Sequence, residues 1–288
     1  MATSDCEKGS SPYNLYVSEP FPCLSCPSAT VRMILTLLPI AINIMAKRPF
    51  IRKQKRKRHG ASFWDYEYTE GGNLKLSVRP SEDLEKFTRW LARQKNSNGL
   101  QKGQTVLDIG CGNGRNLVFL ARDFGMIGTG FDISTAAIAQ AQELGEGYQL
   151  DLTARTMAGD IDLPDNSQDL VLDMMSSHFL NEAERNHLLK EIYRVLKPGG
   201  WLFFKTFLRD GDLHTKRLLA EYPSAEAGTY VHPVIGVPEH VFTEAELKEF
   251  VEPYLQIEKI YRSHKHLSKG QARKRRTISV YAQKDPYR

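Results

Sequence analysis

The sequence predicts an α/β fold built around a doubly wound, mostly parallel sheet, and two observations carry this prediction. Residues 105–116, TVLDIGCGNGRN, form a short apolar run that passes through a glycine-rich turn into a helical pattern. A strand, a glycine turn and a helix in this order make the first half of a nucleotide-binding βαβ unit. Further along the chain, short apolar runs alternate with helical patterns, which is typical of a parallel sheet with helical crossovers.

The glycine-rich turn favours a cationic ligand over a pyrophosphate. Gly110, Gly112 and Gly114 have the spacing GxGxG and not the GxGxxG of pyrophosphate-binding loops. Asp108 precedes them at the carboxyl end of the predicted strand, where a fixed carboxylate would repel a phosphate and attract a cation. S-adenosylmethionine carries an ammonium and a sulfonium and no phosphate, so it suits this turn.

Four segments in chain order resemble motifs of the class I S-adenosylmethionine-dependent methyltransferases, over roughly residues 80–285. They are Asp108 with the three glycines, then 130–134 (GFDIS), 159–169 (GDIDLPDNSQD) and 196–200 (LKPGG). The resemblance implies a methyl-transferring enzyme, S-adenosylmethionine as its cofactor, and a seven-stranded sheet with an antiparallel last strand. It also implies a set of cofactor-binding residues: Asp108, Gly110, Cys111, Gly112, Gly114, Asp132, Ile133, Asp160 and Ile161.

Two helical segments are predicted ahead of the first strand. Residues 62–68, SFWDYEY, are rich in aromatic side chains. In similar proteins such a segment forms a helix that closes over the cofactor; the alternative is that Phe63, Trp64 and Tyr68 pack against the edge of the sheet. A further helix is predicted to begin after Ser81, a favoured N-cap residue that is followed by acidic residues in the first turn.

Acidic residues follow the second and third predicted strands. The second strand spans 126–131 and ends at Asp132, where a carboxylate accepts ribose hydroxyls in nucleoside-binding βαβ units. Ser134 is the predicted cap of the next helix. The third strand is predicted at 156–159. Asp160 follows it at the position that the resemblance assigns to the adenine amino group, with Ile161 beside the ring.

The fourth strand, predicted at 169–175, leads to two candidate catalytic residues. Asp173 and His178 are the titratable side chains near the expected methyl group, because open α/β sheets bind ligands at the carboxyl ends of their strands. His178 could accept a proton from the substrate nucleophile; the alternative is a structural role in this turn. The segment lacks an Asn/Asp-Pro-Pro-aromatic motif, which argues against methylation of base amino groups. No histidines here or downstream have metal-ligand spacing.

The C-terminal third adds an insertion and a hairpin. A helix over 182–196 and a strand over 201–207 are followed by an insertion at 208–242. Long loops at the ligand end of a sheet are commonly functional, so this insertion is assigned to substrate binding, with surface packing as the alternative. Thr243 and Glu246 form a capping box for the next helix. Strands at 256–263 and 277–283 are joined by a basic turn at 265–276.

The methyltransferase domain is predicted to span 61–288, after a leader at 1–44 and a basic arm at 45–60. Within the leader, the apolar run at 33–46 would form a helix of about 21 Å, too short for about 30 Å of hydrocarbon. It is either a weak membrane anchor or, because Met45 could start the native chain, part of a segment that the native protein lacks. Four cysteines without a second metal-type pair indicate reduced thiols. A cytoplasmic protein is expected, with peripheral membrane association as the alternative.

Two basic segments bear on the methyl acceptor. Residues 47–59 hold eight Lys/Arg and residues 262–276 hold seven, both without acidic residues, while the remaining 24 basic residues face 34 acidic ones. Basic patches of this density bind polyanions. RNA or a ribonucleoprotein, bound through 47–59 and 265–276, is therefore the favoured acceptor. A small-molecule acceptor, and a cofactor-binding protein without turnover, are the alternatives.

Overall fold

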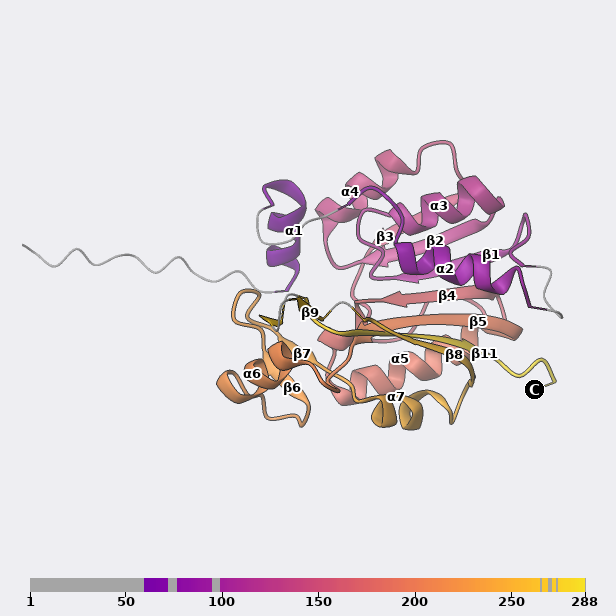
Figure 1. Ribbon diagram of the computed structural model, residues 1–288. Helices are drawn as coiled ribbons and strands as arrows, with labels where there is room; N and C mark the ends of the chain where they lie inside the picture. The colour runs from indigo at the N-terminus through magenta and orange to yellow at the C-terminus, as the bar shows by residue number, and fades with distance from the viewer. Residues whose placement is uncertain are drawn as a thin grey trace, which may run out of the picture. The chain divides into compact units, whose positions relative to one another are not determined.

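The computed structural model describes residues 60–71, 77–94, 99–264, 266–268, 271–272 and 274–287. Its centre is a seven-stranded sheet in the order β3-β2-β1-β4-β5-β11-β8 (Figure 1). The strands are β1 Thr105–Ile109, β2 Ile127–Asp132, β3 Leu150–Ala154, β4 Gln168–Met174, β5 Leu196–Phe207, β8 Gln256–Arg262 and β11 Thr277–Gln283. β1 to β5 pair in parallel, and β11 is antiparallel to both of its neighbours. The predicted sheet, with its antiparallel last strand, is confirmed.

Helices cover both faces of the sheet because both faces are apolar. Side chains alternate along a strand, so Val106 lies in one buried cluster and its neighbour Leu107 in the other. The first cluster includes residues of α2 (Glu82–Leu91), α3 (Arg115–Phe124) and α4 (Thr135–Leu144); the second includes residues of α5 (Glu182–Val195) and α7 (Glu244–Val251). In Figure 1 α3 and α4 are drawn toward the top, α2 in front of the strands, and α5 and α7 toward the bottom. The strand ends are therefore left as the place for a ligand.

The third strand lies six residues earlier than predicted. The assignment to 156–159 is wrong: β3 spans Leu150–Ala154 and pairs in parallel with β2. Two glycines of β2 make room for the leucines of β3. A Cβ on Gly128 would lie 2.6 Å from the Leu150 side chain, and a Cβ on Gly130 would lie 3.1 Å from the Leu152 side chain. β3 is an edge strand with polar residues between its leucines, so it lacks the continuous apolar run of a central strand.

Capping chemistry explains two of the three predicted helix starts. The Ser134 hydroxyl accepts the Ala137 N–H at the start of α4, and Thr243 forms a capping box with Glu246 at the start of α7. Ser81 occupies the N-cap position of α2, but its side chain makes no capping hydrogen bond. Its backbone N–H instead donates to a side chain of α3, which ties the start of α2 to the helix after the glycine turn.

The insertion and the basic turn form one substructure. The insertion folds into α6 (Leu213–Glu221) and a two-stranded sheet of β6 (Thr229–Val231) and β7 (Pro238–His240). The basic turn carries a short hairpin of β9 (Leu267–Ser268) and β10 (Gln271–Ala272). The Asp212 carboxylate, which caps α6, also accepts the backbone N–H of Arg276 at 2.6 Å. The start of α6 is thereby joined to the end of the turn.

Two arginines of the basic turn serve the fold. The Arg275 guanidinium pairs with the Glu239 carboxylate and lies 3.4 Å from the centroid of the Phe207 ring, and Tyr230 donates to the same carboxylate. Arg276 donates to a backbone carbonyl oxygen of the insertion. A polyanionic partner could bind the Arg275 guanidinium only by displacing its contacts with Glu239 and Phe207. The turn therefore gives less support to a polyanionic partner than its composition suggests.

The leader at 1–44, its apolar run and most of the basic arm at 45–60 lie outside the described residues, as do four positions of the basic turn. In the part of the chain that the structure describes, no helix is both long and apolar enough to cross a membrane. The weak anchor predicted at 33–46 stays a prediction.

Arg275→Met is expected to destabilise the protein by about 3 kcal/mol, because it leaves a buried carboxylate without its partner; Glu239 is 2% exposed. Urea unfolding followed by circular dichroism measures this loss. Lys274→Met is the matched control: Lys274 is exposed, so its substitution should change the free energy of unfolding by less than about 0.5 kcal/mol. Equal losses in the two variants would contradict the internal role of Arg275.

Candidate functional site

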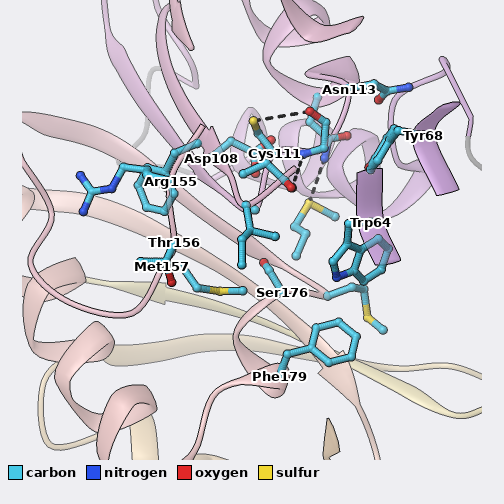
Figure 2. A pocket seen from close by; sticks show the side chains of 18 of the residues that line it. Trp64, Tyr68, Asp108, Cys111, Asn113, Arg155, Thr156, Met157, Ser176 and Phe179 are labelled. Carbon is cyan, nitrogen blue, oxygen red and sulfur yellow. Dashed lines mark hydrogen bonds between the residues drawn. The ribbon is translucent and has the colours of Figure 1, made fainter. Parts of the chain in front are cut away.

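A cavity of about 270 Å³ lies at the carboxyl ends of β1, β2 and β4, next to helix α1 (Ala61–Thr69). β2 and β3 extend the sheet on one side of β1, and β4 and β5 extend it on the other, so the strand order reverses at β1. Open α/β sheets bind ligands at this reversal of strand order. Six of the predicted cofactor-binding residues line the cavity: Asp108, Gly110, Cys111, Gly112, Asp132 and Ile133. Figure 2 shows the cavity with Arg155 and Met157 on one side and Trp64 and Tyr68 on the other.

The backbone of the turn after β1 requires glycine at two positions that line the cavity. Gly110 and Gly112 have φ values of 67° and 56°, in the left-handed region that glycine adopts without strain. A Cβ on Gly110 would lie 2.6 Å from the Cβ of Ser176, and one on Gly112 would lie 2.3 Å from the Tyr68 hydroxyl oxygen. The turn can therefore approach the end of β4 and helix α1 only because it has no side chains there.

The other two predicted residues of the turn have different roles. Cys111 lines the cavity, and burial raises the pKa of its thiol well above the ordinary value, so the thiol is a neutral part of the wall. Gly114 does not line the cavity. It is the left-handed N-cap of α3, and a Cβ there would lie 2.9 Å from the Cβ of Ala141 in α4. Gly114 therefore allows the two helices to pack closely rather than a ligand to approach.

The carboxyl group of Asp108 is buried with one oxygen unpaired. The residue is 2% exposed, and its Oδ2 has no hydrogen-bond partner among the described residues. Burial raises the pKa of Asp108 to about 8, although the nearby Arg115 acts in the opposite direction. A buried carboxyl oxygen without a partner is unfavourable, and a cation placed beside it would favour its charged form. This wall of the cavity is suited to a positively charged ligand group.

The Asp132 carboxylate is held at the end of β2 by two backbone groups. Its Oδ2 accepts the Gly112 N–H at 3.0 Å, and its Oδ1 accepts the Ser134 N–H at 2.9 Å. Burial raises the pKa of Asp132, while these two N–H groups oppose the shift. Each carboxylate oxygen has two lone pairs, so each keeps one acceptor site for the hydroxyl groups of a ligand.

Asp160 and Ile161 lie outside the cavity, contrary to the prediction. The Asp160 side chain is 86% exposed and its Oδ1 lies 2.9 Å from the His187 Nε2, while Ile161 is 3% exposed in the core. The physical reason is the register of β3, which ends six residues before Asp160. The residues that line the cavity after this strand are Arg155, Thr156 and Met157. Placing the edge strand correctly would have identified them.

Helix α1 forms one side of the cavity and is anchored to α4. The Asp65 carboxylate accepts the Ser134 hydroxyl at 2.8 Å, which places a negative charge at the N-terminus of α4, where the helix dipole favours it. Trp64 and Tyr68 line the cavity (Figure 2), whereas Phe63 is 3% exposed in the core. The aromatic segment therefore forms a helix beside the cavity, with Trp64 and Tyr68 lining it and Phe63 buried; closure of this helix over the cofactor stays a prediction.

Neither predicted catalytic residue lines the cavity. Asp173 is 3% exposed, and its Oδ1 accepts the Ser177 N–H at 3.2 Å within the turn after β4. His178 is 2% exposed, its ring packs against that of Phe179, and burial lowers its pKa to about 4, so it is neutral at pH 7. The structure thus buries both side chains beneath the turn after β4, outside the cavity. This agrees with the structural alternative for His178.

The turn after β4 and the insertion form an apolar wall. Five apolar residues line the cavity here: Met174, Met175, Phe179, Leu180 and Val237. Trp64 of α1 meets this wall, with its ring centroid 5.7 Å from that of Phe179. The wall also includes Ser176, whose hydroxyl is donated to the carbonyl oxygen of Ile109 at 2.6 Å. The insertion thus contributes Val237 to the cavity; its assignment to substrate binding stays a prediction.

Comparisons with known proteins identify relatives of this chain. A family profile described as "Methyltransferase domain" matches residues 106–200. The fatty-acid O-methyltransferase of Mycolicibacterium smegmatis is 28% identical over 163 residues, which are 56% of this chain and 58% of that protein. The cycloartenol-C-24-methyltransferase of Arabidopsis thaliana is 32% identical over 165 residues, which are 52% of this chain and 48% of that protein. The chain therefore spans about half the length of these relatives.

A solved structure is similar over a larger share of the chain. It is a S-adenosylmethionine-dependent methyltransferase from Methanosarcina mazei, 27% identical in sequence, with a TM-score of 0.56. The match covers 65% of this chain and 95% of that one. The PH0226 protein of Pyrococcus horikoshii, at 21% identity and a TM-score of 0.56, shares the fold over 76% of this chain and 99% of its own.

The Methanosarcina mazei protein is named as an S-adenosylmethionine-dependent methyltransferase, and the cavity of the present chain fits this cofactor. The unpaired Oδ2 of Asp108 suits its ammonium group, and the open acceptor sites of Asp132 suit its ribose hydroxyls. The absence of a Cβ at Gly112 lets Tyr68 of helix α1 come against the turn, so that both line the cavity. Asp108, Asp132 and Gly112, with the rest of the turn after β1, would hold the cofactor.

Asp132→Ala is expected to weaken the binding of S-adenosylhomocysteine at least tenfold, because it removes hydrogen bonds to a charged group worth about 1.5–3 kcal/mol each. Isothermal titration calorimetry measures the affinity. Asp160→Ala is the matched control, since the exposed Asp160 carboxylate lies outside the cavity and its loss should leave the affinity unchanged. If the Asp160 variant alone lost affinity for S-adenosylhomocysteine, Asp160 would belong to the cofactor site and the structural assignment would be contradicted.

Binding of S-adenosylhomocysteine at pH 7 is expected to release a proton from Asp108. With a pKa of about 8 in the free protein, this carboxyl group is mostly protonated at pH 7, and the ligand's ammonium favours its ionised form. The affinity should therefore increase from about pH 6 to about pH 8 and then level off. Calorimetry in buffers of different ionisation enthalpy counts the released protons, and Asp108→Asn should lower the count. A count that the substitution leaves unchanged would assign the proton to another group.

Proposed function

Because this chain belongs to the class I S-adenosylmethionine-dependent methyltransferases, we propose that it methylates a small apolar molecule whose acceptor atom is already nucleophilic at neutral pH. The observation that carries this proposal is the apolar wall formed by the turn after β4, helix α1 and the insertion. This wall meets the cofactor residues at the reversal of strand order, where the acceptor would have to stand.

Charged and apolar side chains are separated within the cavity. Its ionisable residues belong to the segments after β1, β2 and β3 and to α1: Asp108, Cys111, Arg115, Asp132, Arg155 and Tyr68. The wall after β4 has none among the described residues that line the cavity. A charged acceptor body would lose its hydration at this wall without gaining a partner, whereas an apolar body gains free energy from burial.

No described side chain of the apolar wall can act as a general base. The Ser176 hydroxyl donates to a backbone carbonyl, and His178 lies outside the cavity with its pKa lowered to about 4 by burial. The acceptor atom must therefore bring its own electron pair, as the carboxylate of an ionised acid does. S-adenosylmethionine supplies a methyl group that its positively charged sulfur already makes electrophilic. The task of the protein is then to align the acceptor and to exclude water.

The relatives support a small acceptor over RNA. The two named above are methyltransferases named for fatty acids and for cycloartenol, which are small and largely apolar. RNA, the acceptor favoured from the sequence, has less support, because Arg275 and Arg276 are engaged within the fold. The basic segment at 47–59 lies outside the described residues, so RNA binding through it stays a prediction.

Purified protein is expected to transfer a labelled methyl group from S-adenosylmethionine to decanoic acid and not to decan-1-ol, because the acid is ionised at pH 7 and the alcohol would need a base. Decanedioic acid tests the apolar wall in the same assay. Its second carboxylate would be buried without a partner, so its methylation should be at least tenfold slower than that of decanoic acid. Extraction of the methyl esters into organic solvent and scintillation counting measure all three rates.

Total RNA added to the same reaction distinguishes the two acceptor classes. Label in the RNA fraction, with none in the decanoic acid methyl ester, would overturn the proposal. The Asp132→Ala protein gives the background rate, since it is expected to lose cofactor affinity while keeping the apolar wall. Equal methylation of the acid and the alcohol would show that a base is present after all.

A further inference from the structure

Met175 has a backbone conformation that most side chains disfavour. Its φ is 64°, in the left-handed region, and among the described non-glycine residues Asn166, with a φ of 52°, is the other case of positive φ. Asparagine adopts this region more often than most residues because its short polar side chain can form local hydrogen bonds. Methionine has no such compensation, and glycine would adopt the same conformation without strain.

The turn after β4 needs this conformation. The Met175 N–H donates to the carbonyl oxygen of Lys205 at 2.8 Å, which continues the pairing of β4 with β5 by one residue. The next residue, Ser176, is 6% exposed. It lies so near Gly110 that a Cβ added to Gly110 would be 2.6 Å from the Cβ of Ser176. A left-handed residue between these two contacts turns the chain from the sheet into the short helix η1 (Ser177–Phe179). The turn thus requires a left-handed residue, but it does not require a side chain.

The side chain of Met175 lines the cavity at the boundary between its two parts. β4 pairs with β1, so the residue after β4 stands next to the turn that carries the cofactor residues. Phe179, Leu180 and Val237 of the apolar wall line the same cavity. Strained residues persist at sites where the side chain or the geometry has a function. An unbranched thioether also fits well into an irregular apolar space.

We propose that Met175 is a specificity-determining residue that sets the width of the acceptor site. Its side chain limits the size of the apolar group that can stand beside the reacting atom, and the chain keeps methionine at a position where glycine would relieve the backbone. This inference rests on the proposed function, since it assigns the apolar wall to the acceptor.

Two substitutions separate the volume of the side chain from the strain of the backbone. Met175→Gly and Met175→Ala both remove the side chain, but only glycine relieves the strain, so the glycine variant should have the higher melting temperature of the two. Both variants should bind the bulky 1-adamantanecarboxylic acid at least tenfold more tightly, relative to the slim decanoic acid, than the unsubstituted protein does. Titration calorimetry of each acid into the complex with S-adenosylhomocysteine gives the two affinities.

Asn166→Gly is the control for strain alone. Asn166 is left-handed as well, but it lies in the turn before β4, does not line the cavity, and accepts a hydrogen bond from Lys284. Its substitution can change the melting temperature and should leave the ratio of the two affinities unchanged. A change of that ratio in Asn166→Gly as large as in the Met175 variants would overturn the inference.

An affinity ratio that stays within about twofold of the unsubstituted protein in both Met175 variants overturns the inference. So does a lack of detectable binding of 1-adamantanecarboxylic acid to either variant. Methyl transfer to decanoic acid by the unsubstituted protein tests the proposed function separately. If no methyl transfer to decanoic acid is seen but the affinity ratio shifts as expected, the proposed function fails and the role of Met175 stands. If methyl transfer is seen but the affinity ratio is unchanged in the Met175 variants, only the role of Met175 is overturned.

Discussion

The close approach of three chain segments at the glycine turn is the constraint on which the site depends. Gly110 comes against the end of β4 at Ser176, and Gly112 comes against helix α1 at the Tyr68 hydroxyl. A side chain at either glycine would push away one of the two other walls of the cavity. The same turn brings the Gly112 N–H to the carboxylate of Asp132. The turn therefore determines where the acidic, aromatic and apolar walls meet, before any ligand is bound.

Two buried carboxyl groups show how structural and functional charges differ in this protein. Glu239 and Asp108 are each 2% exposed. Glu239 is paired with Arg275 and accepts a hydrogen bond from Tyr230, and these two neighbours hold its pKa below the usual value in spite of burial. Asp108 has an oxygen without a hydrogen-bond partner among the described residues, and burial raises its pKa to about 8. An unpaired buried carboxyl group lowers stability, so its presence in a cavity indicates that its partner is a ligand.

The sequence predicts those features whose cause lies within a few neighbouring residues. The turn after β1 and the helix caps at Ser134 and Thr243 are of this kind, and the structure agrees with them. β3 could not be placed in this way, because an edge strand with polar residues facing solvent has a weak apolar pattern, and the error displaced the assignment of Asp160. Arg275 was likewise grouped with a surface patch, since its partner Glu239 is 36 residues away in the sequence. Long-range pairing is thus what the sequence does not reveal.

The apolar side of the cavity draws on two parts of the chain. The family profile covers residues 106–200, which include the turn after β1, the end of β2 and the turn after β4. Helix α1 and the insertion, which contribute Trp64 and Val237 to the apolar side, lie outside it. Cofactor binding requires fixed charges and a fixed backbone, which the paired strands supply. The acceptor side proposed above also uses segments that are attached to the sheet without being part of it, and such segments can differ between relatives while the sheet stays the same. Membership of the family therefore identifies the methyl donor, and the acceptor has to be inferred from Trp64, Met175 and Val237.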